Sequence, residues 1–119
     1  MKIFVAHSSN FDFKNELYLP LRSSELNKNH EIFLPQEKSD LGPVTKDTIK
    51  SSNLIIAEVS YPSTGQGIEL GWANIFGVPI ICIYKEGSKI SRSLNKLTDK
   101  FIIYENAKDM IQKLTEFTK

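Results

Sequence analysis

Five short apolar runs divide the sequence, each rich in Ile, Val, Phe or Tyr and bounded by turn residues. Within each run the apolar residues are consecutive rather than alternating with polar ones. This pattern is typical of strands that are buried on both faces of a parallel sheet. We therefore predict strands at residues 2–7, 31–35, 53–59, 79–84 and 100–104.

The segments between these runs have helical spacing. Segment 11–29 contains Pro20, so we expect its helix to kink or to begin late. Five strands that alternate with helices predict an α/β protein with a five-stranded parallel, doubly wound sheet of flavodoxin-like order 2-1-3-4-5. We expect one domain over residues 1–119. The clearest helical face is formed by Ala107, Met110, Ile111, Leu114 and Phe117, and a shorter one by Ile90, Leu94 and Leu97.

This topology predicts where a ligand binds. In the order 2-1-3-4-5 the switch point lies between strands 1 and 3, and ligands bind there at the carboxyl ends of the strands. The loop after strand 1 is HSSN (7–10) and the loop after strand 3 is SYPSTGQG (60–67). We therefore expect these loops to face each other across one crevice.

The amino-acid composition limits the kinds of molecule that we expect this protein to bind. The 15 basic and 14 acidic residues leave a net charge of +1, which gives no electrostatic reason to expect a nucleic acid or a membrane surface. The single cysteine, Cys82, excludes a disulfide framework and a cysteine zinc site, and its apolar surroundings predict a buried thiol. No apolar run approaches the ~18 residues of a membrane span. We expect a cytoplasmic protein without a metal or an organic cofactor.

The stretch PSTGQGIELG (62–71) is the most informative part of the chain. A dinucleotide fingerprint fits poorly, because Leu70 stands at the third glycine position and the stretch follows the third strand rather than the first. A P-loop is excluded because no Gly-Lys-Ser/Thr follows the glycines. The simplest interpretation is that Gly65 and Gly67 form a tight turn and that Glu69 is an acid in the first turn of a helix.

A second interpretation gives the stretch a chemical role. Ser63, Thr64 and the bare backbone at Gly65 and Gly67 would form a small polar cup beside Glu69. We expect neighbouring N–H groups to keep this carboxylate ionised and fixed. An ionised carboxylate beside a sugar-sized cup is the arrangement of a glycosyl-transfer nucleophile.

The segment IIAEVSYPSTGQGIELGWA (55–73) resembles the signature of the nucleoside 2-deoxyribosyltransferase superfamily. It is especially similar to the 2'-deoxynucleoside 5'-phosphate N-hydrolase branch, whose proteins carry A-E-V-[ST]-x-P-S-x-G-x-G-x-E-L-G. The resemblance extends over nearly the whole chain. It implies a flavodoxin-like sheet, a homodimer with a shared active site, and Glu69 as the nucleophile at the anomeric carbon of a 2-deoxyribosyl group.

The same resemblance implies further site residues. Ser63 matches the serine that contacts the 5'-phosphate in the hydrolase branch, and Ser93 matches a serine that reaches the phosphate site of the partner subunit. Ser93 is equally consistent with a helix-start serine. His7, Ser8 and Ser9 lie in the first-strand loop that surrounds the ligand. Gly65 and Gly67 would let the sugar or its phosphate approach the backbone.

The sequence lacks one residue that the resemblance predicts, an aspartate on the helix before strand 3. The family usually carries an aspartate on the helix before strand 3, eight residues ahead of the residue that begins that strand. Here Asn53 begins the strand, and eight residues back is Thr45. A positioned acid–base group is worth typically 10²–10⁴ in rate. Asp47 is our preferred candidate for this role, because a local shift of the helix would be enough to bring it to the expected position. The alternatives are Glu37, Asp40 and His7.

The leading hypothesis is an enzyme, an N-glycosidase or 2-deoxyribosyltransferase. It would cleave or transfer the N-glycosidic bond of a 2-deoxynucleoside or its 5'-monophosphate. The first alternative is a nucleotide-binding or sensing module that has lost catalysis, which the missing aspartate would explain. A further alternative is a TIR-like domain acting on NAD-related nucleotides, because IFVAHSS (3–9) is similar to the first strand of that family. The base, and the choice between hydrolysis and transfer, stay open.

Overall fold

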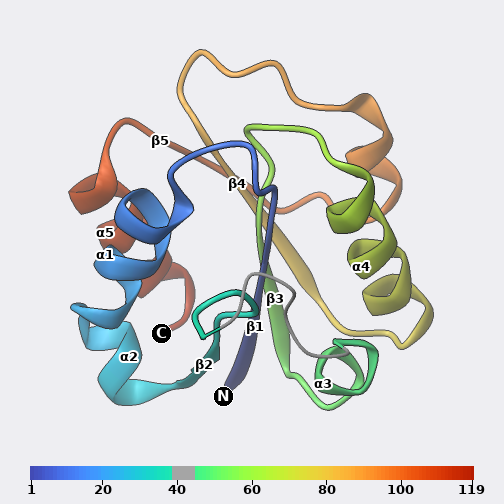
Figure 1. The fold of residues 1–119 in the computed structure, drawn as a ribbon, viewed down its shortest axis with the longest axis horizontal. Coiled ribbons are helices and arrows are strands. Elements are labelled where there is room, and N and C mark those ends of the chain that lie inside the picture. The colour runs from blue at the N-terminus through green and yellow to red at the C-terminus, as the bar shows by residue number, and fades with distance from the viewer. Residues whose placement is uncertain (39–44) are drawn as a thin grey trace.

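A parallel five-stranded sheet forms the centre of the molecule in the computed structural model, which describes residues 1–38 and 45–119 (Figure 1). The strand order β2-β1-β3-β4-β5 confirms the predicted fold class. The strands are β1 (Lys2–His7), β2 (Glu31–Phe33), β3 (Leu54–Glu58), β4 (Ile80–Lys85) and β5 (Phe101–Tyr104).

The central strands are buried on both faces, which explains their continuous apolar runs. On β1, Ile3 and Val5 face one hydrophobic core, while Phe4 and Ala6 face the other. Cys82 of β4 lies in the second core, and burial raises the pKa of its thiol to about 11. Successive side chains of a strand thus serve two separate cores.

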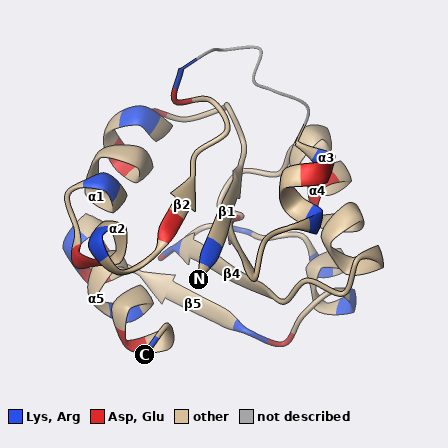
Figure 2. Ribbon diagram, turned by 90° about the horizontal axis from the view of Figure 1, so that it is seen from below, with Lys and Arg blue, Asp and Glu red and all other residues tan. Residues whose placement is uncertain are grey.

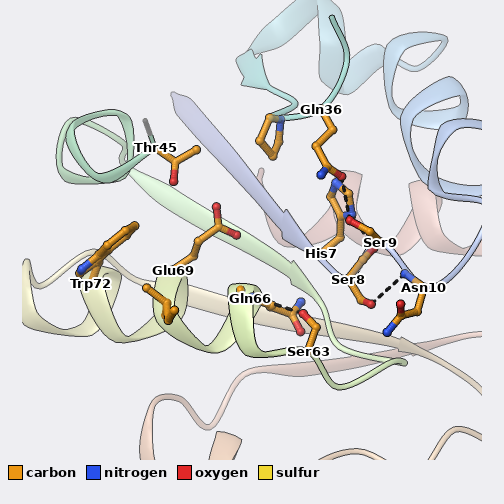
Figure 3. A pocket seen from close by; sticks show the side chains of 13 residues that line it. His7, Ser8, Ser9, Asn10, Gln36, Thr45, Ser63, Gln66, Glu69 and Trp72 are labelled. Atoms are coloured by element: carbon orange, nitrogen blue, oxygen red, sulfur yellow. Dashed lines mark hydrogen bonds between the residues drawn. The ribbon is translucent and has the colours of Figure 1, made fainter. Parts of the chain in front are cut away.

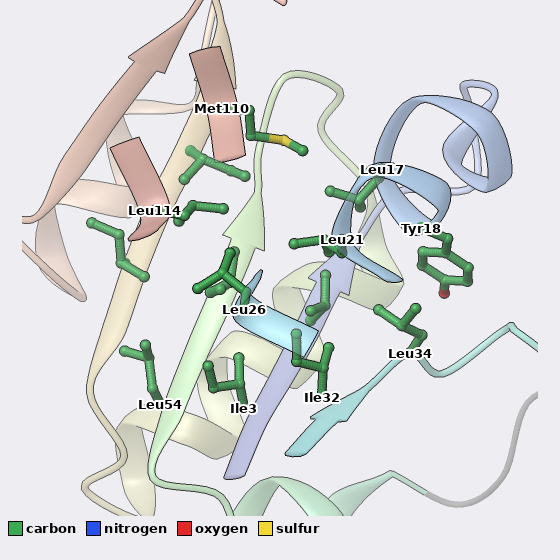
Figure 4. Packing of buried hydrophobic residues seen from close by; sticks show 14 of the residues in the cluster. Ile3, Leu17, Tyr18, Leu21, Leu26, Ile32, Leu34, Leu54, Met110 and Leu114 are labelled. Atoms are coloured by element: carbon green, nitrogen blue, oxygen red, sulfur yellow. The ribbon is translucent and has the colours of Figure 1, made fainter. Parts of the chain in front are cut away.

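Helices cover each face of the sheet (Figure 1). The first core, shown in Figure 4, packs under α1, α2 and α5, whereas the second packs under α3 and α4. The helices on the first side are α1 (Leu19–Arg22), α2 (Glu25–Asn29) and α5 (Ala107–Phe117), and the α-helices on the second side are α3 (Lys46–Lys50) and α4 (Thr64–Ile75).

The helical segment around Pro20 is broken into short pieces. A single π-helical segment, η1 (Lys14–Tyr18), runs directly into α1, with Pro20 in the first turn of that helix. Pro20 has no N–H to continue the hydrogen bonds of η1, and the helical path changes from π to α at this point. The expected helix near Leu94 is a short 3-10 segment, η2 (Arg92–Lys96).

Charged residues of both signs are mixed over the outer surfaces of the helices (Figure 2). This mixing agrees with the near-zero net charge of the sequence. Among the described residues, no helix is both long enough and apolar enough to cross a membrane.

Candidate active site

A cavity of about 430 Å³ opens at the carboxyl ends of β1 and β3, where the strand order reverses. The loops after these two strands face each other across it, as the topology predicted (Figure 3). Every described residue that lines it lies between His7 and Trp72 in the sequence. The lining residues are His7, Ser8, Ser9, Asn10, Pro35, Gln36, Thr45, Ser63, Gly65, Gln66, Ile68, Glu69 and Trp72.

Gln66 joins the helix beneath the cavity to both strands. Its side-chain amide donates to the backbone oxygen of Glu58 at 2.6 Å and to that of Ala6 at 3.3 Å. These carbonyls lie at the ends of β3 and β1, and Gln66 itself is buried. The amide therefore fixes the start of α4 against the point where the two strands separate.

Glu69 projects from the second turn of α4 into the cavity (Figure 3). The helix begins at Thr64, so Glu69 is not the first-turn acid of the simplest interpretation, and the unpaired N–H groups of the first turn lie below it. Burial raises the pKa of its carboxyl to about 7, although a hydrogen bond from Thr45 acts in the opposite direction. The expectation of a fully ionised carboxylate is therefore wrong: near neutral pH both forms are populated.

The glycines of this stretch lie inside α4 rather than in a turn. A β-carbon added at Gly65, Gly67 or Gly71 would meet no atom within 4 Å. Glycine inside a helix destabilises it by roughly 0.5–1 kcal/mol relative to alanine, and packing within this chain does not require it here. Gly65 lines the cavity, so its missing side chain leaves space beside Glu69 that a ligand could occupy.

Ser63 is the N-cap of α4. Its hydroxyl accepts a hydrogen bond from the backbone N–H of Gln66 at 3.3 Å. A hydroxyl has one donor and two acceptor positions, so this cap leaves the Ser63 O–H able to donate into the cavity. The backbone N–H groups of Thr64 and Gly65 have no partner within the helix and lie at the same end.

Aromatic side chains pack against His7, and both of its ring nitrogens form hydrogen bonds. Its Nδ1 lies 2.8 Å from the backbone oxygen of Ser8, and its Nε2 lies 2.5 Å from the hydroxyl of Tyr18. A carbonyl can only accept, so Nδ1 carries the proton and Nε2 accepts from the Tyr18 hydroxyl. That hydroxyl in turn accepts from the backbone N–H of Gln36 at 3.0 Å. Burial lowers the pKa of His7, which keeps the ring neutral.

Ser8 and Ser9 complete this wall of the cavity. The Ser8 hydroxyl accepts from the backbone N–H of Asn10 at 3.0 Å, and the Ser9 hydroxyl donates to the side-chain oxygen of Gln36 at 3.1 Å. The wall thus consists of neutral hydrogen-bonding groups that are held by one another.

Two of the acid–base candidates, Asp47 and Glu37, are not among the described residues that line the cavity. Asp47 is exposed on α3. Thr45 stands beside Glu69 instead. Glu37 forms a two-pronged ion pair with Arg22 at 2.7 and 2.9 Å, which lowers the pKa of its carboxyl. Asp40 lies outside the described residues.

Gly67 and Ser93 line a second cavity of about 350 Å³ on the other side of Ser63 and Gln66. It lies between α4 and η2, where Ser91 caps the 3-10 segment by accepting from the N–H of Ser93. The structure therefore does not bring Ser93 to Glu69 within one chain.

A buried carboxylate fixes the loop between β3 and α4. Glu58 is 1% exposed; it accepts from the backbone N–H of Ser60 at 2.7 Å, from the Ser60 hydroxyl at 2.9 Å and from the Tyr104 hydroxyl. Burial raises the pKa of this carboxyl, against the effect of its donors. Glu58 thereby ties the loop that leads to Ser63 to the neighbouring strands.

Sequence reasoning missed several residues of the cavity wall. Trp72 lies one turn after Glu69 on α4, a spacing that could have indicated it. Gln66 lies within the stretch 62–71, but nothing in the sequence indicates that its side chain forms hydrogen bonds to two strands. Gln36 and Thr45 come from loops and helix ends that only the fold brings close.

The fold and the cavity define an α/β protein with one half-buried carboxylate facing a small-molecule-sized cavity, with polar and apolar walls, at a switch point. Of the described lining residues, only Glu69 and His7 are titratable, and His7 is held neutral. Among the residues described, no cluster of His, Cys, Asp or Glu could hold a metal ion. The arrangement suits attack by the carboxylate on an electrophilic carbon.

Several known proteins are similar to this chain in sequence or in fold. A Syntrophotalea carbinolica protein, named provisionally as 2'-deoxynucleoside 5'-phosphate N-hydrolase 1, is 37% identical over 54 residues, 44% of this chain and 38% of that protein. The structure of a Clostridium botulinum CMP N-glycosidase, BcmB, is similar with a TM-score of 0.68 and 28% identity, over 97% of this chain and 99% of that one. A 2-deoxyribosyltransferase from Leishmania mexicana shares the fold, with a TM-score of 0.57 and 22% identity over 78% and 75% of the two chains.

These similarities confirm the resemblance to the nucleoside 2-deoxyribosyltransferase superfamily, and its 5'-phosphate N-hydrolase branch fits. The match with the Syntrophotalea carbinolica relative spans well under half of that protein's length. No protein-family model matches the chain.

Proposed function

We propose that this protein is an enzyme that cleaves the N-glycosidic bond of a nucleoside 5'-monophosphate or nucleoside, with Glu69 as the nucleophile. The observation that carries the proposal is the half-buried Glu69 carboxylate, which projects into a cavity at the switch point beside a ligand-sized space. Support also comes from the N-hydrolase and N-glycosidase names of similar proteins.

The proposed chemistry has two steps. A carboxylate oxygen of Glu69 bonds to the anomeric carbon as the bond from that carbon to the base nitrogen breaks, and the base leaves with the bonding electrons and takes up a proton. Water then attacks the anomeric carbon, loses a proton that balances the one taken up by the base, and releases Glu69 as a carboxylate. A second base in place of water would give transfer.

A 5'-phosphate would bind at the amino end of α4. The O–H of Ser63 and the N–H groups of Thr64 and Gly65 are donors there, and the helix dipole favours an anion. No lysine or arginine is among the described residues that line the cavity. We therefore expect only a modest preference for the monophosphate over the free nucleoside, and weak dependence of this preference on salt.

The test is release of free base, measured by chromatography from nucleosides and 5'-monophosphates of both ribose and 2-deoxyribose. CMP and its deoxy counterpart belong in the panel, as does a second free base in half of the reactions. Glu69→Gln should abolish release, whereas Glu86→Gln, a change of an exposed glutamate outside the cavity, should not. New nucleoside in the presence of added base would indicate a transferase. Release that persists in Glu69→Gln would refute Glu69 as the nucleophile.

The resemblance also leads us to propose a homodimer with a shared site. Ile68 and Ile75 of α4 are 50% and 81% exposed, and they are apolar residues on the helix that carries Glu69. If Ser93 of one subunit completes the site of the other, Ser93→Ala and Glu69→Gln should each be inactive. Mixed after unfolding and refolding, they should regain about a quarter of wild-type activity, because half of the dimers then carry one intact site. No recovery in a mixture shown to be dimeric would contradict a shared site.

A binding module without catalysis is the second candidate. Thr45 favours it, because this neutral residue stands beside Glu69 where the family resemblance predicts an acid. In that case the wild type would bind a nucleotide, detected by fluorescence of the single tryptophan Trp72 in the cavity wall, but would release no base.

A further inference from the structure

Thr45 stands at the start of α3 without capping it. Its backbone angles are φ −95° and ψ −13°, and its carbonyl accepts from the N–H of Ile49 at 2.9 Å. Threonine is favoured before a helix because its side-chain oxygen accepts a backbone N–H, yet Thr45 makes no such bond. The helix therefore does not use its hydroxyl.

The hydroxyl is instead directed at Glu69 across the cavity (Figure 3). The Thr45 hydroxyl lowers the pKa of the Glu69 carboxyl, against the larger effect of burial. A hydroxyl that donates to a carboxylate favours its ionised form and one orientation of the group.

The packing of α3 on α4 keeps Thr45 near the helix that carries Glu69. Ile49 of α3 is fully buried in the core beneath both helices. The Lys46 ammonium lies 5.9 Å from the centre of the Trp72 ring, and that of Lys50 lies 5.6 Å from the Phe76 ring. These contacts join α3 to α4, the helix that carries Glu69, and Lys46 directly follows Thr45 in the chain.

We propose that Thr45 is a positioning residue for Glu69: its hydroxyl holds the carboxylate in the orientation from which it would attack the sugar carbon. This inference rests on the proposed function. An aspartate at the same place would add a like charge and would share a proton with Glu69. The neutral hydroxyl orients the carboxylate without either effect, so Glu69 titrates as a single group.

The test compares Thr45→Val, which keeps the shape of the side chain but removes the donor, with Thr45→Ser, which keeps the donor. The first readout is the pKa of Glu69, followed by NMR with carboxyl-labelled glutamate and assigned by Glu69→Gln. We expect Thr45→Val to raise this pKa above the wild-type value of about 7, and Thr45→Ser to leave it unchanged. The second readout is base release, where Thr45→Val should lower kcat about tenfold or more with little change in KM, and Thr45→Ser should restore it.

The two readouts separate this inference from the proposed function. A protein that releases no base but shows the expected pKa pattern would refute the proposed function and still support the bond that positions Glu69. An unchanged pKa and unchanged kcat in Thr45→Val would overturn the inference. If Thr45→Val does not fold, judged by circular dichroism, Thr45→Ala is measured against Thr45→Ser with the same expectations.

Discussion

The Nε2 of His7 lies 2.5 Å from the hydroxyl oxygen of Tyr18, and this bond joins two walls of the cavity. The backbone N–H of Gln36 donates to the same hydroxyl, so Tyr18 links the loop after β1 to the loop after β2. Both nitrogens of His7 are occupied and burial lowers its pKa. His7 therefore acts as a structural support of the cavity rather than as a proton donor.

Replacing Tyr18 with phenylalanine should destabilise the protein. The change leaves His7 Nε2 without its donor and the N–H of Gln36 without its acceptor, a loss of about 1–3 kcal/mol in the free energy of unfolding. Denaturant unfolding measures it. Tyr84→Phe is the matched control, because Tyr84 is half-buried and none of its described contacts is a hydrogen bond through its hydroxyl. Equal stability of the two variants would contradict the prediction.

Activity should fall on acidification with a midpoint near pH 7. The nucleophile must be ionised, and burial raises the pKa of Glu69 to about 7. Below that value kcat/KM should decrease about tenfold per pH unit. Base release from one substrate between pH 5 and 9 measures this profile. A rate that stays constant down to pH 5 would show that Glu69 does not act as a carboxylate nucleophile.

Glu69→Gln should make the folded state more stable in alkaline solution. The folded pKa of about 7 lies above the ordinary value of 4.5, so the fold favours the protonated carboxyl, and this stability is lost as the pH rises through 7. The amide does not ionise. The variant should therefore gain on the order of 2–3 kcal/mol over wild type at pH 8.5 and almost nothing at pH 4.5.

Glu86→Gln, a change at an exposed site, should show neither effect. A gain for Glu69→Gln that is equal at both pH values would point to a packing effect rather than to ionisation.

Gly65→Ala and Gly71→Ala should have the same effect on stability and different effects on binding. Both glycines lie inside α4, and an added β-carbon meets no protein atom at either place, so each change should stabilise the fold by about 0.5–1 kcal/mol. Only Gly65 lines the cavity beside Glu69. Nucleotide binding, followed by Trp72 fluorescence in a Glu69→Gln background, should weaken in Gly65→Ala alone. Unchanged binding there would exclude a close approach of the ligand to this backbone.

Strand order and the place of the cavity could be predicted from the sequence, because both follow from local patterns. Runs such as 54–57 are apolar at every position because their side chains alternate between two cores, and five parallel strands leave one switch point. The start of α4 could not be predicted as easily. Gly65 and Gly67 indicate a turn locally, but the Ser63 cap and the bonds of Gln66 to two strands stabilise a helix there.

The family resemblance pointed to position 45 as the neighbour of Glu69, but the threonine there led us to prefer Asp47. Thr45 and Asp47 are two residues apart, and chemistry alone favours the aspartate. The packing of α3 against α4 decides which of them faces the cavity, and it selects Thr45. The role of Glu58 could not be predicted from the sequence either, because its partner Tyr104 lies on a distant strand.

The described residues that line the cavity all lie between His7 and Trp72, whereas β4, β5 and α5 contribute none. The chain is thus divided into a ligand-facing part and a supporting part that meet along the β3–β4 pairing. Chimeras with a crossover after Trp72 should therefore inherit the substrate preference of whichever parent supplies the first part. The supporting part could be exchanged or stabilised by protein engineering without redesigning the cavity of one chain, provided that Ser93, which we propose for the partner's site, is kept.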